Sequence, residues 1–259
     1  RWSLVMDGRN RRGDRLRTAI VAALKDDPAQ RDLAALLEKW DGVDRADQAA
    51  PLVYQAMYRE IALGTFTNKL GEDAAKDMLS TWYFWQQRFD ALVATPDSPW
   101  FDNPETKDKR ETLADVIRTA APRARASIEA LQGKDPAAWA WGKAHTLSFV
   151  SPLRRSGAGQ ELAGGFTVQR PGSGETLNRG VYDFQKPFAV NFFPSMRVVV
   201  DFADPDKINA VVAGGVSERH FQPHQNDQAR ILVAGERRSW WFNPKQVEAH
   251  AKSRATLSP

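Results

Sequence analysis

Apolar residues recur at intervals of three and four along the first half of the chain. At this spacing side chains share one face of a helix, so each stripe predicts a helix with one buried face. The stripes comprise Leu16, Ile20, Ala23 and Leu24; Leu33, Leu36, Leu37 and Trp40; Val53, Met57 and Ile61; and Leu113, Val116 and Ile117. We expect Asp27 and Pro28 to begin the second helix, and Asp41 and Gly42 to end it.

A longer helix is predicted from about residue 72 to residue 93. Its apolar face carries Ala75, Met78, Leu79, Trp82, Trp85, Phe89 and Leu92. Aromatic rings at helical spacing are typical of a buried core, because covering large rings stabilises a helical layer. Pro122 should end or kink the helix that starts near Leu113, since proline lacks the amide hydrogen that a helix interior needs.

The spacing changes after Trp139, where short β-branched runs replace the helical stripes. Residues 144–150 favour a strand, and residues 196–202 and 208–213 predict an antiparallel hairpin with a turn between them. Two strands alone form a marginal sheet in water. Their continuous apolar composition predicts burial on both faces, so we expect the hairpin to join a larger sheet.

The sequence supplies no other clear strands for that sheet. We therefore expect the partner strands on another polypeptide or on a removed N-terminal part, and the start at Arg1 agrees with processing of a longer protein. Residues 157–180 are rich in glycine, serine and arginine and predict a long surface excursion. Polar helices are predicted over about 226–234 and 244–251.

Composition narrows the classes of function. The 259 residues contain no cysteine, which excludes a disulfide scaffold, a thiol nucleophile and cysteine-ligated zinc. No apolar run approaches the roughly 20 residues that span a bilayer. The net charge of +4 is spread along the chain, and residues 9–17 are interpreted as a solvated loop and helical turn rather than a nucleic-acid patch. We therefore expect neither a membrane nor a nucleic acid as partner.

Histidines mark two candidate sites for chemistry. His220 and His224 have the spacing of a metal-binding pair on a helix. Pro223 between them breaks that helix, so a capping or packing role is favoured and no metal site is predicted. His145, close to Trp141, is interpreted as a structural histidine because no positioned nucleophile accompanies it.

Asp201 is the remaining candidate, at the end of the apolar run 198–200 that follows Arg197. A carboxylate at the end of a buried strand either pairs with an arginine for structural reasons or orients a catalytic imidazole. The spacing alone favours the structural role. No self-contained active site emerges from the sequence, and no residue is assigned to substrate binding.

Several short segments carry a family resemblance. They are EKWDG (38–42), WGKAHT (141–146), PSMRVVVD (194–201), GGVS (214–217), PHQNDQ (223–228), and WF (241–242) followed by VEAH (247–250). In this order they resemble the C-terminal portion of the large subunit in the penicillin acylase family of N-terminal-nucleophile hydrolases.

The resemblance implies an α+β fold with a mainly helical first two-thirds. Residues 1–143 would form a helical region, and residues 144–259 a strand-containing region that joins a larger αββα hydrolase sheet formed with other chains. The implied activity is an acylase that removes apolar acyl groups from amides such as penicillins or N-acyl homoserine lactones. Its nucleophile would be an N-terminal serine on a companion chain.

The resemblance transfers few functional residues. No position here matches the family's nucleophilic serine, its oxyanion asparagine or its calcium ligands, so it implies no cofactor in this chain and allows a structural calcium elsewhere in the enzyme. Asp201 matches an acidic residue that steers a histidine near the nucleophile in some relatives, with aspartate in place of glutamate.

The expected partners are companion chains of the same processed precursor and a small-molecule amide, in a periplasmic or secreted enzyme. The alternative from another class is a non-enzymatic helical interaction module built on the tryptophan-rich helices. The two hypotheses differ in one respect: the module would be stable alone, whereas the acylase fragment would expose apolar surface without its companions.

Overall fold

The chain forms two compact units in the computed structural model, which describes residues 2–80, 84–150, 165–217, 219 and 221–257. The larger unit comprises Asp7–Leu147 and Gln169–Phe193, and the smaller one comprises Arg1–Met6, Ser148–Val168 and Pro194–Pro259. Among the described residues, no helix is long and apolar enough to cross a membrane.

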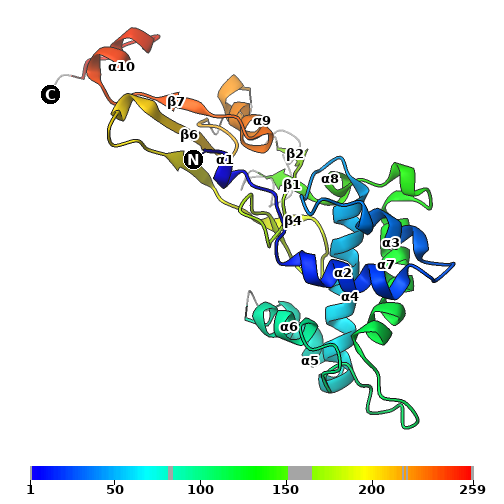
Figure 1. The fold of residues 1–259 in the computed structure, drawn as a ribbon. Coiled ribbons are helices and arrows are strands. Elements are labelled where there is room, and N and C mark those ends of the chain that lie inside the picture. Colours follow the sequence, from blue (N-terminus) through cyan, green and yellow to red (C-terminus); the bar gives the residue numbers. More distant parts are fainter. Residues whose placement is uncertain (1, 81–83, 151–164, 218, 220, 258–259) are drawn as a thin grey trace. The chain divides into compact units, whose positions relative to one another are not determined.

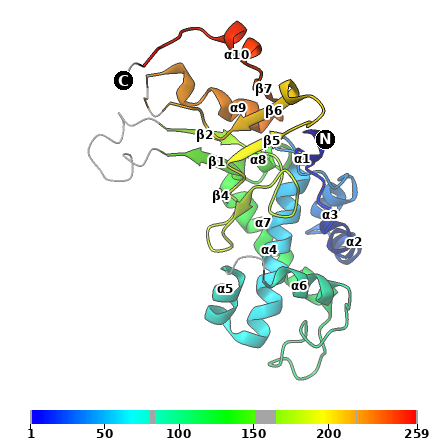
Figure 2. The same cartoon turned by 90° about the vertical axis from the view of Figure 1, so that its left-hand side faces the viewer.

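The larger unit is a layer of helices with one short hairpin. Its elements are α2 (Gly13–Leu24), α3 (Arg31–Glu38), α4 (Ala49–Leu70), α5 (Glu72–Ser80), α6 (Gln86–Val93), α7 (Leu113–Gln132), the 3₁₀ turn Pro136–Ala138, α8 (Trp141–Ala144), β3 (Val181–Tyr182) and β4 (Val190–Phe192). Helix α4 forms its centre, because every residue from Ala50 to Tyr58 is buried. Figures 1 and 2 show α7 alongside α4, its most extensive helical neighbour.

The periodic stripes correctly predict α2, α3 and α4. Helix α3 begins at Arg31, later than the predicted start at Pro28. The reason is local, because the carboxylate of Asp27 accepts the amide hydrogen of Ala29 at 2.9 Å and closes a separate turn before the helix.

The single helix predicted over 72–93 is wrong. The structure has α5 and α6 instead, with a turn at Phe84 and Trp85, while Trp82 lies outside the described residues. The indole of Trp85 packs edge-on against Phe184, with ring centroids 4.9 Å apart, and its Nε1 donates to the carbonyl of Leu79 at 3.2 Å. This long-range burial of one ring accompanies a break that helical spacing does not reveal.

Pro122 does not end its helix, because α7 runs from Leu113 to Gln132 with the proline inside it. A capping box at the start of α7 pairs Thr112 with Asp115 in both directions. A buried face then follows the whole helix: Val116, Ile117, Ala120, Ala121, Ala124 and Ile128. Packing on this face offsets the roughly 3 kcal/mol that a proline costs a helix interior.

The smaller unit contains a three-stranded antiparallel sheet. Its elements are α1 (Trp2–Val5), β5 (Met196–Val199), the 3₁₀ turn Pro205–Lys207, β6 (Ile208–Val212), the 3₁₀ turn Pro223–Gln225, α9 (Asp227–Ala234), β7 (Arg238–Trp240) and α10 (Pro244–His250). The predicted hairpin is confirmed, with Arg197 opposite Val211. The short polar strand β7 was not predicted, and it pairs with β6 so that Ile208 faces Trp240. Strands β1 (Thr146–Phe149) and β2 (Phe166–Gln169) form a separate pair.

Strand β5 does not bury both faces within this chain. Its alternation places Arg197 inward at 5% exposure, whereas Met196 and Val198 on the opposite face are 53% and 37% exposed. Val200, immediately after the strand, continues the exposed face at 38%. The apolar side chains of β5 on this face therefore lack a full cover among the described residues, whereas Ala210, opposite Val198 on β6, is buried.

The surface excursion predicted over 157–180 is wrong from Arg170 onward, and residues 157–164 lie outside the described residues. Arg170, Ser173 and Asn178 are buried against the helical layer. The amide of Gly172 donates to the carbonyl of Asp44, and its own carbonyl accepts the indole N–H of Trp141, both at 2.8 Å. Polar composition did not reveal this burial because the contacts use backbone groups.

Asp44 is the most perturbed carboxyl group of this region. Its side chain is fully buried beside Ser173 and Asn10. Loss of hydration raises the pKa of Asp44 to about 8, and the nearby Glu175 contributes in the same direction. Asp44 is therefore largely protonated at neutral pH.

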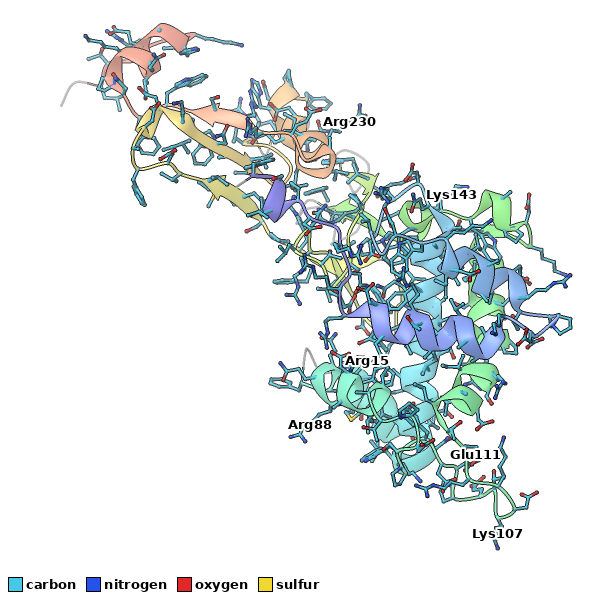
Figure 3. All side chains as sticks on the ribbon, in the orientation of Figure 1. Arg15, Arg88, Lys107, Glu111, Lys143 and Arg230 are labelled. Atoms are coloured by element: carbon cyan, nitrogen blue, oxygen red, sulfur yellow. The ribbon has the colours of Figure 1, made fainter. Side chains whose placement is uncertain are left out.

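Four exposed basic side chains of the larger unit lie on different segments of the chain. Arg15, Arg88, Lys107 and Lys143 are all exposed, and Figure 3 shows them on separate elements. This distribution agrees with the predicted spread of the net positive charge.

Substituting Gly142 tests the close contact beneath α8. A Cβ there would lie 2.8 Å from the Cβ of Ala46 and 3.0 Å from its carbonyl oxygen. We expect Gly142→Ala to lower the free energy of unfolding by about 1–3 kcal/mol in chemical denaturation. The control is Gly64→Ala inside α4, where the new methyl meets the flexible end of Arg123 at 3.3 Å, and helix propensity predicts a gain of about 1 kcal/mol. Equal effects of the two substitutions would contradict the packing argument.

The raised pKa of Asp44 predicts a pH dependence of stability. The unfolded carboxyl ionises near its ordinary pKa of about 4, whereas the folded one keeps its proton to about 8. Its contribution is therefore complete below pH 4 and is lost as the pH rises towards 8, with a slope of at most about 1.4 kcal/mol per pH unit.

Chemical denaturation of the wild type and of Asp44→Asn across pH 4–8 measures this slope. The difference between their free energies of unfolding at each pH isolates Asp44, because the other titrating groups contribute equally to both proteins. We expect the stability of Asp44→Asn relative to the wild type to rise with pH over this range. An exposed aspartate, Asp26, provides the matched control Asp26→Asn. Parallel curves for the wild type and Asp44→Asn would show that Asp44 titrates normally.

Candidate functional site

Asp201 lies two residues after the end of β5 and is exposed. Its Oδ1 accepts the amide hydrogen of Ala203 at 3.1 Å, and its carbonyl accepts that of Asp204 at 3.1 Å, so it closes the turn of the hairpin. Among the described residues it forms neither an ion pair with an arginine nor a hydrogen bond with a histidine. Arg197 instead points inward and donates to the carbonyl of Leu232 at 3.3 Å. The carboxylate of Asp201 thus keeps most of its hydrogen-bonding capacity at an exposed edge.

Two of the family segments, 214–217 and 223–228, meet at the end of the hairpin opposite its turn. A Cβ on Gly215 would lie 2.0 Å from the carbonyl oxygen of His224, so only glycine fits there. That carbonyl accepts the amide hydrogen of Val216 at 2.8 Å. Gln228 completes the junction, since its amide donates to Gly214 at 2.9 Å. The segments 214–217 and 223–228 therefore form one packed corner, away from Asp201 at the turn.

Asp227 anchors this corner through two side chains. Its Oδ2 lies 2.9 Å from Nη1 of Arg238 and 3.0 Å from Nδ1 of His224. Burial opposes ionisation of Asp227, but the hydrogen bonds from His224 and Arg238 outweigh it and lower the pKa of its carboxyl. The arrangement ties α9 to β7, which agrees with the predicted packing role of His224. His220 lies outside the described residues, and the described ones contain no cluster of three metal-ligating side chains.

His145 has the environment of a structural histidine. Its ring is fully buried and stacks on Trp141 with centroids 4.3 Å apart, and its Nδ1 lies 2.7 Å from the carbonyl oxygen of Phe188. Burial lowers the pKa of His145 to about 3, so the imidazole is neutral at working pH. The nearby Ser148 instead shares a hydrogen bond of 2.8 Å with Thr167. His145 therefore supports the fold rather than proton transfer.

The EKWDG segment is also a packing motif. The indole of Trp40 is buried and donates to the carbonyl of Val43 at 2.9 Å. The predicted helix end at Asp41 and Gly42 is wrong, because α3 ends at Glu38; Gly42 lies in the following loop, where its φ of 80° favours glycine. In the part of the chain that the structure describes, no serine or threonine hydroxyl is hydrogen-bonded to a histidine. The described residues thus hold no complete nucleophile and base.

Comparisons with known proteins test the family resemblance of the ordered motifs. The profile of the Penicillin amidase family matches residues 2–249. The acyl-homoserine lactone acylase QuiP of Pseudomonas fluorescens Pf-5 is 27% identical over 254 residues, covering 94% of this chain and 30% of that protein. The QuiP protein of Pseudomonas aeruginosa is 28% identical over 241 residues, covering 86% of this chain and 28% of that protein. The chain therefore spans less than a third of these relatives.

A solved structure shows the same fold. The thermostable penicillin G acylase from Alcaligenes faecalis aligns with 98% of this chain and 47% of its own chain, with a TM-score of 0.59 and 14% identity. Together with the family match along residues 2–249, this similarity establishes the relationship that the ordered motifs indicate. The chain belongs to the penicillin amidase family.

Proposed function

We propose that this chain is part of an acylase that hydrolyses the amide bond between an apolar acyl group and an amine. The observation that carries the proposal is the family match over residues 2–249. N-acyl homoserine lactones are the proposed substrate class, because both relatives described above are named for acylases of these signals. Cleavage of such signals would give the enzyme a role in quorum quenching, and penicillins are the second substrate class to test.

The proposed reaction uses an N-terminal serine on a companion chain, exposed by autocatalytic cleavage of a precursor. Its α-amino group, with an ordinary pKa near 8, accepts the hydroxyl proton as the oxygen attacks the amide carbonyl. Backbone and side-chain donors stabilise the resulting oxyanion. The proton then passes to the leaving amine, an ester forms between serine and the acyl group, and water releases the carboxylic acid. These groups would all lie outside the present chain, in a periplasmic or secreted enzyme.

This chain would contribute a helical layer and an edge of the hydrolase sheet. Three observations support that role: the exposed apolar face at Met196, Val198 and Val200, the incomplete catalytic set among the described residues, and the coverage of less than a third of the relatives. A companion strand that covers this face would remove its apolar side chains from water, which favours association.

Asp201 has a specific place in the proposal, where its carboxylate accepts a hydrogen bond from an imidazole of the companion chain. Asp201→Asn keeps the size of the side chain and removes its charge. We expect kcat for an N-acyl homoserine lactone to fall by roughly 10- to 100-fold, with KM and the thermal midpoint unchanged, because the role is to position a histidine. The variant should also alter the pH profile of kcat.

The matched control for this experiment is Asp26→Asn, at an exposed aspartate of the larger unit, which should leave kcat unchanged. If Asp201→Asn has the same kcat and pH profile as the wild type, Asp201 only closes the hairpin turn. A lower thermal midpoint with a proportional loss of activity would likewise assign it a structural role.

The acylase hypothesis predicts dependence on companion chains, whereas the hypothesis of a helical interaction module does not. Intact-mass analysis of the native particle should show further polypeptides, one of which begins with serine. The 259-residue chain expressed alone should bind a hydrophobic dye through the face at Met196 and Val198. A single monodisperse 29.0 kDa species that binds no dye would instead favour the module.

A further inference from the structure

The larger unit contains an acidic pocket with a volume of about 270 Å³. Its walls come from α5, α6, β3 and β4, together with the buried segment that precedes β3. The described lining residues include two carboxylates, Glu175 and Asp183, and no lysine, arginine or histidine. The charge of these lining residues is negative, whereas the chain as a whole carries a net charge of +4.

Glu175 is held by hydrogen bonds and forms no ion pair among the described residues. Nε2 of Gln55 donates to its Oε2 at 3.2 Å, and the hydroxyl of Tyr182 donates to Oε1 of Gln55 at 3.0 Å. Among the described residues, no basic group lies within ion-pair distance of Glu175, since Arg12 is bound to Asp90 at 2.5 Å instead. Desolvation raises the pKa of Glu175, although the hydrogen bonds from Gln55 and Ser173 and the attraction of Arg12 oppose the shift.

Aromatic rings form the other walls of the pocket. Trp85 and Phe184 meet edge to face with centroids 4.9 Å apart, and Tyr182 stacks on Phe184 at 5.8 Å. Aromatic faces attract cations, most strongly where water is excluded. A carboxylate beside such rings is the combination that recognises an organic ammonium group, whereas it repels carboxylates and phosphates.

We propose that this pocket binds a small organic amine in its ammonium form, with the charge at Glu175 and the apolar part against Trp85 and Phe184. The pocket volume lies below the roughly 300 Å³ at which sites for drug-sized ligands begin, so the ligand is of the size of benzylammonium. The proposal is independent of the hydrolytic reaction, because it needs no nucleophile and no turnover.

Titration calorimetry of the native protein with benzylammonium chloride tests the proposal. Benzyl alcohol has the same shape without the charge, and benzoate carries the opposite charge. We expect benzylammonium to bind at least about tenfold more tightly than benzyl alcohol, because cation–π attraction and the carboxylate act on the charge alone. Benzoate should not bind. Equal affinity for the alcohol, or no binding of benzylammonium to the wild type, overturns the proposal.

Substitution locates the site. Glu175→Gln keeps the side-chain shape, and we expect it to weaken benzylammonium binding by about tenfold. Glu105→Gln makes the same chemical change at an exposed loop position and should leave the affinity unchanged. The comparison of benzylammonium with benzyl alcohol in the wild type needs no variant, so it holds even if Glu175→Gln does not fold. Unchanged affinity in a folded Glu175→Gln protein overturns the assignment to this pocket.

Discussion

A polar segment can be buried only when its backbone groups find partners, and the larger unit depends on how residues 170–180 meet this requirement. Gly172 donates to the carbonyl of Asp44 and accepts from the indole of Trp141. The amide of Asn178 donates to the carbonyl of Asp7 at 2.8 Å. These bonds join parts of the chain that are far apart in sequence. They also place the half-buried side chain of Glu175 beside Gln55 and the rings that line the pocket.

The family motifs that lie in the larger unit act through the same kind of contact. Trp141 and Gly142 allow α8 to approach Ala46 closely, and Trp40 and Gly42 shape the loop that follows α3. Such positions tolerate few side chains, because a methyl group in a tight contact costs about 1–3 kcal/mol. This explains how the chain is recognisable as a family member although its described residues hold no complete catalytic set. The family motifs of the larger unit make packing contacts and do not form a catalytic set.

The sequence predicted the features that depend on local pattern. The stripes at helical spacing located α2, α3 and α4, because these helices bury a face that the spacing reveals. Runs of β-branched residues located β5 and β6 through their preference for extended backbone. The break at Trp85, the continuation of α7 through Pro122 and the short strand β7 depend on distant partners. No spacing rule could find them.

The candidate sites differ in the same way: some give a local signal in the sequence, and others depend on distant residues. Asp201 was selected as a candidate because it ends an apolar run, a local signal, and its role stays a prediction. Asp44 and Glu175 were missed, because a single carboxylate in a polar segment reads as solvated until the fold is known. Burial beside residues more than a hundred positions away raises both pKa values: Asp44 lies beside Ser173, and Glu175 lies beside Gln55, whose hydrogen bond opposes the shift.

The hairpin joins the two features on which the proposed function depends. Its exposed apolar side chains Met196, Val198 and Val200 alternate with Arg197 and Val199, and Asp201 follows Val200 in the chain. A companion that covers the apolar face would also withdraw water from the carboxylate. An unpaired carboxylate would oppose such cover, whereas one that accepts a hydrogen bond from an imidazole would be strengthened by the lower dielectric. Assembly of the chains and orientation of the companion imidazole are thus coupled in the proposed enzyme. The companion that covers the apolar face also strengthens the hydrogen bond of Asp201.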